Sequence, residues 1–224
     1  MIKKICTVFL VIAVISLGVV YLINDGVKSE GVVIDKNIIT EEYKEDRINI
    51  YYPQIENVDK SINDLIKKET LNGLKYYEEK ENLTLDINYD IKLLSDDYIS
   101  IVYSGIGYIQ GTAHPNNIFY TTNINLKDVK KTRLTDIVTI DEDFLDLLRK
   151  SAKEQLPDAI YESFSTTSFG DNEKLLKYLK NSDKLELNSE EQFDTFSYMT
   201  DDKIGISLPV SHAIGDYIEI EISK

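Results

Sequence analysis

Residues 111–136 read GTAHPNNIFYTTNINLKDVKKTRLTD, and the order of features in this stretch decides the fold. A loop of small residues, Gly111–Pro115, lies between two strand-like runs and leads into a strand that we predict over 118–126. That strand ends in an Asn-x-Asn-Leu motif at 123–126, a polar turn follows, and Leu134-Thr135-Asp136 comes next. The stretch therefore predicts a tight connection between two strands of a sheet.

The chain before this loop contains its clearest periodicity. From Leu83 to Leu93, apolar residues occupy every second position and polar residues lie between them. This alternation is typical of an antiparallel strand with one buried face. A turn at Ser95-Asp96-Asp97 follows, so we expect Tyr98–Ile109 to return as the second arm of a hairpin.

The rest of the chain alternates between helical and strand patterns. The other predicted elements are a strand over 47–52 that stops at Pro53, helices over 59–80, 141–156 and 172–179, and strands over 193–199, 203–208 and 217–222. The order β-α-β-β-β-α-α-β-β-β predicts an α+β fold, with helices packed on one face of antiparallel sheets. We expect two α+β subdomains, 41–110 and 111–224, that share one core.

Residues 1–24 have the composition of a membrane segment. Two lysines precede Ile5–Ile23, a run of 19 residues without charge. At about 1.5 Å per residue, such a helix crosses most of a bilayer core of about 30 Å. Because the sequence that follows is a poor cleavage site, we predict an uncleaved signal anchor, with a cleaved and secreted form as the alternative. The lysines place the N-terminus inside, so residues 25–224 would lie outside the cell membrane, with a tether over 25–40.

Charge is the second informative property of the chain. After removal of the two lysines before the membrane segment, residues 25–224 carry 23 basic and 39 acidic side chains, a net charge of −16. This balance argues against nucleic acid, which requires a basic stripe. It favours a cationic partner, although an acidic surface also serves solubility alone. The single cysteine, Cys6, lies in the membrane segment, so the exported part is expected to contain no disulfide.

The order of motifs in 111–136 resembles the extracellular domain of RsiV-type anti-sigma factors. The same domain forms the non-catalytic half of PdaC-type peptidoglycan deacetylases. In these proteins a Gly-Ala-His loop precedes an Asn-x-Asp/Asn-Leu strand end and a Leu-x-Asp before a helix. The end of the chain also fits, since Phe196–Gly215 resembles the closing hairpin and loop of the family. The resemblance implies an extracytoplasmic recognition domain with lysozyme as its ligand, and the lack of cysteine in the exported part suits the surface of a Gram-positive bacterium.

Departures from the family pattern bear on the expected activity. The anti-sigma factors carry a cytoplasmic sigma-binding region before the membrane segment, and the deacetylases carry a catalytic domain after the recognition domain. This chain starts at the membrane segment and ends at Lys224, so we expect neither activity. We also expect no other enzymatic activity and no cofactor, because no serine elbow or metal-ligand spacing is present. The closing loop is poorer in tyrosine than the family pattern.

The resemblance directs attention to two loops, 111–117 and 209–217, which contain the only two histidines of the chain. It implies that these loops lie at one edge of the sheet as a recognition surface. The predicted partner-binding residues are Gly111, Thr112, Ala113, His114, Pro115, Asn116, Pro209, His212 and Tyr217. The alternative is that both loops are ordinary turns. Histidines more than 90 residues apart, without an exported cysteine, predict no metal site.

Together these features predict a membrane-anchored extracytoplasmic binding protein that captures or inhibits a C-type lysozyme. An acidic domain would be steered towards so basic a ligand. The alternative is a module that binds cell-wall glycan or muropeptide through tyrosines, which predicts binding that is insensitive to salt.

Overall fold

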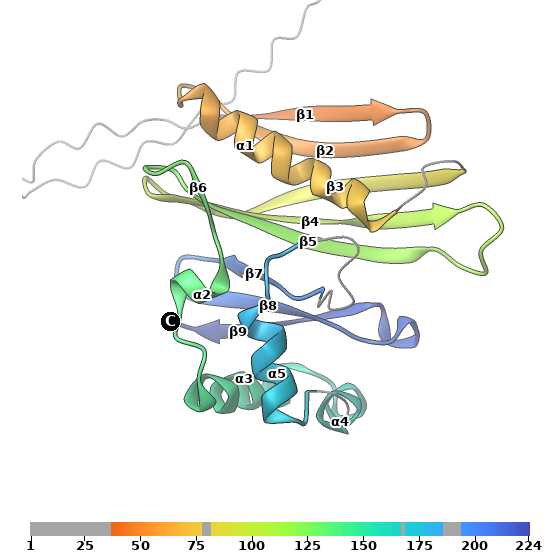
Figure 1. Ribbon diagram of the computed structural model, residues 1–224, viewed down its shortest axis with the longest axis vertical. Coiled ribbons are helices and arrows are strands. Elements are labelled where there is room, and N and C mark those ends of the chain that lie inside the picture. Colours follow the sequence, from red (N-terminus) through yellow and green to blue (C-terminus); the bar gives the residue numbers. More distant parts are fainter. Residues whose placement is uncertain (1–36, 78–81, 167–168, 186–193) are drawn as a thin grey trace, which may run out of the picture. The chain divides into compact units, whose positions relative to one another are not determined.

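The computed structural model of the protein describes residues 37–77, 82–166, 169–185 and 194–224 (Figure 1). All of them belong to one compact unit, 35–224. The predicted membrane segment and residues 25–36 of the predicted tether lie outside the described residues, so the anchor stays a prediction. Within the described ranges, no helix is long and apolar enough to cross a membrane.

Six strands form the larger sheet, in the order in which they occur along the chain. They are β1 (Ile38–Glu45), β2 (Ile48–Ile55), β3 (Leu83–Leu94), β4 (Tyr98–Ile109), β5 (Asn116–Asn125) and β6 (Lys130–Thr132). All neighbours are antiparallel except β2 and β3, which run parallel. The crossover that this parallel pair requires is the helix α1 (Lys60–Thr70) with the 3-10 helix η1 (Leu71–Tyr76). α1 packs on one face of the sheet (Figure 1).

The alternation in β3 produces the face on which α1 packs. Leu83, Leu85 and Ile87 are at most 1% exposed, whereas the polar residues between them face solvent. α1 begins after Asp59, whose side chain accepts a hydrogen bond of 2.8 Å from the backbone N–H of Ser61. The periodicity of the strand and the cap of the helix thus build the first core from local sequence.

The α-helix ends earlier than the helix predicted over 59–80. Beyond Thr70 the chain continues as η1, in which Gly73 lies so close to Tyr120 of β5 that a Cβ atom there would be 2.7 Å from the tyrosine Oη. The Tyr120 hydroxyl donates a hydrogen bond of 2.6 Å to the backbone O of Thr70. This bond satisfies one of the carbonyl groups that the end of an α-helix leaves without a partner.

Three strands, β7 (Phe196–Met199), β8 (Lys203–Pro209) and β9 (Tyr217–Ser223), form a second, antiparallel sheet. The helices that precede it along the chain are α2 (Leu134–Ile137), α3 (Glu142–Gln155), α4 (Asp158–Thr166) and α5 (Asn172–Lys180). One face of β8 and β9 is aliphatic and packs with these helices through Ile204, Ile206, Leu208, Ile218, Ile220 and Ile222. The second core therefore lies between the small sheet and the helices (Figure 1).

The two sheets meet through buried polar side chains. Asn123 of β5 is 1% exposed; its Oδ1 accepts a hydrogen bond of 2.6 Å from the Ser100 hydroxyl, and its Nδ2 donates one of 2.8 Å to the backbone O of Ser197 in β7. The Ser100 Oγ also accepts the backbone N–H of Met199 at 2.9 Å. The first asparagine of the Asn-x-Asn-Leu motif therefore joins the larger sheet to the smaller one.

Asp183, in the segment after α5, holds the same junction. Its carboxylate accepts the backbone N–H groups of Leu134 and Ser197, both at 2.7 Å, and the Ser197 hydroxyl at 2.8 Å. Burial raises the pKa of Asp183, and the hydrogen bonds oppose this rise. The Asp136 side chain accepts the backbone N–H of Arg133 at 2.9 Å at the start of α2. Both Leu134 and Asp136 of the Leu-Thr-Asp motif thus fix the fold at this point.

The predicted α+β class and the predicted order of strands and helices are confirmed. Within the described residues, the structure adds four strands or α-helices that the sequence patterns did not indicate, namely β1, β6, α2 and α4, and the short 3-10 helix η2 (His212–Ile214). β1 begins at Ile38, within the predicted tether over 25–40, and its charged residues suit an exposed edge strand. The larger sheet also continues through Thr132, beyond the predicted subdomain boundary between residues 110 and 111.

The strand predicted over 47–52 does not end at Pro53, so this prediction is wrong: the corresponding strand, β2, continues to Ile55. Proline cannot donate to a strand ladder, so it interrupts a strand only where a donor is needed. β3 pairs with β2 over Ile48–Ile50 alone, whereas Pro53 pairs with Thr40 of β1. The missing N–H therefore breaks no ladder bond on the β3 side.

Candidate functional site

The β4–β5 loop and the β8–β9 loop meet in the structure although they are far apart in the sequence. The rings of His114 and His212 stack, with centroids 3.7 Å apart and planes 9° apart. Both side chains are exposed. The structure thus places the two histidines of the predicted surface against each other, each contributed by a hairpin of a different sheet.

Asp216 connects the two loops. Its Oδ1 lies 2.8 Å from the Nδ1 of His212, and its Oδ2 accepts the backbone N–H of Asn117 at 2.7 Å. The Asn117 side chain in turn donates to the backbone O of Gly215 at 3.4 Å. Gly215 and Asp216 have φ angles of 121° and 72°, left-handed values that glycine adopts freely and aspartate more readily than most residues. The turn that directs Asp216 towards the other loop therefore depends on the glycine.

The β4–β5 loop is a fixed turn with an exposed tip. Gly111 has a φ of 99°, and the backbone N–H and the hydroxyl of Thr112 donate to the backbone O of Ile109 at 3.1 and 2.8 Å. Ala113 and Pro115 follow as exposed residues around the histidine. The predicted residues of this loop thus form one continuous exposed segment.

Tyr77 contacts the β4–β5 loop through Asn116 and was not among the predicted site residues. Burial raises the pKa of its hydroxyl, a hydrogen bond with the Asn116 side chain lowers it, and the charge of Asp216 raises it. Gly107 of β4 makes room for the ring, since a Cβ atom there would be 1.7 Å from the Tyr77 Oη. The sequence predicted Tyr77 only as part of the helix over 59–80, and the tertiary structure shows its contact with the site.

Two hollows adjoin the loops and share Pro209 and Val210. The first, which we name the acidic hollow, has a volume of about 280 Å³ and is lined by Asn116, Asn117, Phe119, Asp194, Pro209, Val210, Asp216 and Tyr217. The second, the aromatic hollow, has a volume of about 300 Å³ and is lined by Ser163, Phe164, Phe169, Tyr178, Pro209, Val210, Ser211 and Ile214. Three of the predicted residues, Asn116, Pro209 and Tyr217, thus line the acidic hollow.

The acidic hollow combines carboxylates and amides with an aromatic wall. The rings of Phe119 and Tyr217 lie 4.6 Å apart and tilted by 38°. Burial, followed by the nearby charge of Glu219, raises the pKa of the Tyr217 hydroxyl. Asp194 and Asp216 contribute negative charge, and the lining contains no basic side chain. This chemistry suits a ligand group that is both cationic and planar or apolar.

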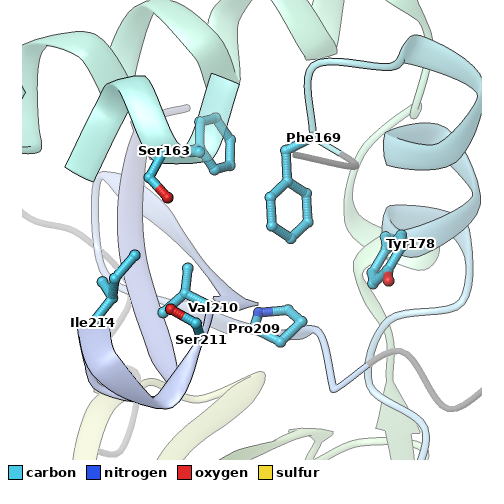
Figure 2. Close-up of a pocket in the computed structure, with 8 residues that line it drawn as sticks. Ser163, Phe169, Tyr178, Pro209, Val210, Ser211 and Ile214 are labelled. Atoms are coloured by element: carbon cyan, nitrogen blue, oxygen red, sulfur yellow. The ribbon is translucent and has the colours of Figure 1, made fainter. Parts of the chain in front are cut away.

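The aromatic hollow lies between α4, α5 and the β8–β9 loop. Phe164 and Phe169 stack at 5.0 Å, and Tyr178 meets Phe169 edge-on at 5.5 Å. Figure 2 shows Phe169 and Ser163 directed into the space that faces Val210. Arg149 of α3 donates a hydrogen bond of 3.1 Å to the backbone O of Phe169 and so fixes this wall. The hollow is therefore a preformed, uncharged cavity beside the histidine pair.

The sequence did not single out Phe119, Asn117, Asp194 or Asp216 as site residues. Phe119 lies within a predicted strand and carries no signal of function, whereas Asn117 and Asp216 lie in the two loops that the resemblance implied, without being among the predicted contact residues. Within the described ranges, no group of three or more histidine, cysteine, aspartate or glutamate side chains is arranged to hold a metal ion. The arrangement offers recognition by stacking, hydrogen bonds and negative charge.

Comparison with known proteins identifies the fold. No protein-family model and no curated protein sequence matches the chain. Its structure is similar to the crystal structure of a DUF3298 family protein from Pseudomonas aeruginosa PAO1, with a TM-score of 0.51 and 11% identity over 84% of this chain and 89% of that one. A DUF3298 family member from Bacteroides fragilis NCTC 9343 gives a TM-score of 0.48 and 18% identity over the same shares. The first likeness shows that the described unit has a DUF3298-like fold.

Proposed function

We propose that this protein is an extracytoplasmic binding protein, anchored through residues 5–23, whose DUF3298-like domain captures a C-type lysozyme and blocks it. The observation that carries the proposal is the joining of the loops at 111–117 and 209–217 by the His114–His212 stack. Loops that a rigid scaffold holds in place are the usual location of binding residues. In this proposal the domain acts by binding alone and not as an enzyme.

The charge of the domain supports a cationic ligand. Residues 25–224 carry a net charge of −16, and Asp216 brings a carboxylate to the joined loops. Opposite charge accelerates encounter and fixes orientation more than it adds affinity. A strongly basic protein such as a C-type lysozyme fits this surface, which agrees with the resemblance to RsiV-type domains.

A second candidate ligand is a cell-wall glycan or muropeptide. The acidic hollow presents the rings of Phe119 and Tyr217 beside the amides of Asn116 and Asn117. Aromatic rings that offer an apolar face, with polar groups beside them, are suited to stacking on sugars. Such binding would depend little on salt, because a neutral sugar is not steered by charge.

The test is binding of the 35–224 unit to a C-type lysozyme at low salt and at near-physiological salt, with residual lysozyme activity measured in parallel. We expect binding that persists at the higher salt, with slower association, because the Debye length falls to about 8 Å. Block of lysozyme activity would indicate that the domain covers the catalytic cleft. Absence of binding at both salt concentrations would refute lysozyme as the ligand and favour the glycan.

The variant Asp216→Asn tests whether the joined loops form the contact. Asparagine tolerates the left-handed φ at this position, so the turn is retained while the charge is removed. The matched control is Asp128→Asn, an exposed aspartate in the turn beyond the opposite end of β5. We expect the first variant to weaken lysozyme binding by about tenfold or more and the control by less than about twofold. Equal effects would show that only the overall charge matters.

A further inference from the structure

The two hollows are the basis of a more specific inference about the ligand. Both hollows are lined by Pro209 and Val210, so a ligand segment that lies over this pair can reach both. Each volume, about 280 and about 300 Å³, lies at or just below the lower end of the range for small-molecule pockets, about 300–1,000 Å³. Volumes of this size suit single side chains of a protein partner better than a large cofactor.

The acidic hollow has the chemistry of an arginine pocket. A guanidinium group presents five N–H donors in one plane and stacks on aromatic faces. Asp216 uses two of the roughly four acceptor positions of its carboxylate for His212 and the Asn117 backbone, so it can accept further hydrogen bonds. The half-buried ring of Tyr217, which packs on the buried ring of Phe119, provides the stacking surface.

The aromatic hollow has the chemistry of an apolar pocket. Its lining has no charged side chain, and its walls are the rings of Phe164, Phe169 and Tyr178 with the aliphatic Val210 and Ile214. Large apolar side chains that enter preformed pockets are typical anchors of protein interfaces. The hydrogen bond from Arg149 to the Phe169 backbone keeps this wall in place before any partner binds; the entropy cost of ordering it is therefore small.

We propose that the two hollows form one bipartite docking site for a protein segment in which an arginine is followed by a large apolar residue. The arginine enters the acidic hollow and the apolar side chain enters the aromatic hollow. The occupant follows from charge complementarity, since the domain is strongly acidic and neither lining contains a basic side chain. The inference rests on the proposed function, because it names the partner chemistry at the same surface, but it does not require the partner to be lysozyme.

The experiment uses the full chain in detergent micelles and fluorescent tetrapeptides that are acetylated and amidated. The peptides are Gly-Arg-Leu-Gly, the same peptide with citrulline in place of arginine, and the same peptide with glycine in place of leucine. Citrulline keeps the shape of arginine and removes its charge. We expect each replacement to weaken binding by about tenfold, since each removes one anchor. Equal binding of all three peptides, or no saturable binding of any, would overturn the proposal.

Two pairs of variants assign the anchors to the hollows. Ser163→Leu on α4 fills the aromatic hollow, and Ser165→Leu places the same side chain at an exposed position of that helix. Asp216→Asn removes a charge of the acidic hollow, with Asp128→Asn as its control. We expect Ser163→Leu to abolish the preference for leucine and Asp216→Asn to abolish the preference for arginine, while both controls bind as the parent does.

The outcomes separate this inference from the proposed function. Lysozyme capture that is unaffected by Ser163→Leu, in a protein whose peptide binding shows no preference for leucine, would overturn the bipartite site and leave the function standing. Peptide binding with the expected preferences, in a protein that does not bind lysozyme, would refute lysozyme as the ligand and support the bipartite site. Displacement of the peptide only by a muropeptide, with no discrimination between arginine and citrulline, would overturn the arginine pocket.

Discussion

Replacement of Asn123 by alanine tests whether the two sheets are joined as the structure indicates. The side chain is 1% exposed and makes two short hydrogen bonds, one from the Ser100 hydroxyl at 2.6 Å and one to the backbone O of Ser197 at 2.8 Å. Alanine removes both bonds and cannot replace them. The Ser197 carbonyl keeps a hydrogen bond of 2.6 Å from the Thr121 hydroxyl, whereas the Ser100 hydroxyl loses its acceptor.

The expected loss of stability follows from these contacts. Each of the two hydrogen bonds contributes about 1 kcal/mol net, and a buried donor left without an acceptor costs about 1–3 kcal/mol. Because these contributions overlap, we expect Asn123→Ala to lower the free energy of unfolding by about 2–4 kcal/mol. For a domain of this size, about 1 kcal/mol shifts Tm by roughly 2–4 °C, so Tm should fall by roughly 5–15 °C.

The assay is urea unfolding of the 35–224 unit, followed by circular dichroism and by tyrosine fluorescence, because the chain contains 15 tyrosines and no tryptophan. The matched control is Asn88→Ala, an exposed asparagine in the middle of β3. It should change stability by less than about 0.5 kcal/mol, as surface substitutions usually do.

A double-mutant cycle provides the stricter test. Ser100→Ala and Asn123→Ala remove the two ends of one hydrogen bond, so their effects should not add, with an interaction energy of about 0.5–3 kcal/mol. The reasoning is refuted if the two effects are additive, or if Asn123→Ala costs no more than Asn88→Ala. Either result would mean that the sheets are held together without the asparagine.

Further substitutions test other parts of the fold. Gly107→Ala places a Cβ atom 1.7 Å from the Tyr77 Oη, so we expect urea unfolding to show a loss of about 1–3 kcal/mol; a neutral effect would contradict the close packing. Tyr120→Phe removes the 2.6 Å hydrogen bond to the backbone O of Thr70 and should cost about 1–2 kcal/mol by the same measurement; unchanged stability would show that this bond does not stabilise the end of α1. Burial raises the pKa of Asp183 above its ordinary value near 3.8. Between the pKa of the unfolded state and the higher pKa of the folded state, the folded protein keeps a proton that the unfolded chain releases. The contribution of Asp183 to stability therefore falls as the pH rises through this range. The stability of the parent relative to Asp183→Asn should therefore decline above about pH 4, and a difference that rises with pH would show that the hydrogen bonds outweigh burial.

Local patterns in the sequence were sufficient to predict most elements. The alternation from Leu83 to Leu93 specifies a half-buried strand without reference to the rest of the chain. Asp141 accepts the backbone N–H of Phe144 at 3.0 Å, so the aspartate at which the helix over 141–156 was predicted to begin caps it in the structure. Such features depend on neighbours in the sequence and are therefore visible in it.

Elements that depend on distant contacts were not predictable in this way. α2 has only four residues, and its first backbone N–H is bound by Asp183, which follows nearly 50 residues later. β1 is largely polar and exposed, so it has no apolar period that would mark a strand. The motif residue Asn123 carried the family resemblance, yet in the structure it joins two sheets rather than contacting a ligand.

The candidate site was predictable only in part for the same reason. The sequence identified both histidine loops, but the stack of His114 on His212 and the part played by Asp216 arise from the docking of one sheet on the other. The hollows depend on this docking too, because the acidic hollow takes residues from β5 and from β9. No local pattern encodes a contact between chain segments about 100 residues apart.

The division of the chain into two sheets has a consequence for the time course of folding. Both sheets pair strands that are consecutive along the chain, but the larger sheet is complete at Thr132 and the smaller sheet starts only at Phe196. During synthesis the N-terminal part of a chain folds first. We therefore expect hydrogen exchange of nascent chains stalled before Phe196 to show protected β4–β5 amides, and their exposure would contradict this order. On this view a newly made chain passes through a stage in which its first sheet is folded but its ligand is not yet recognised.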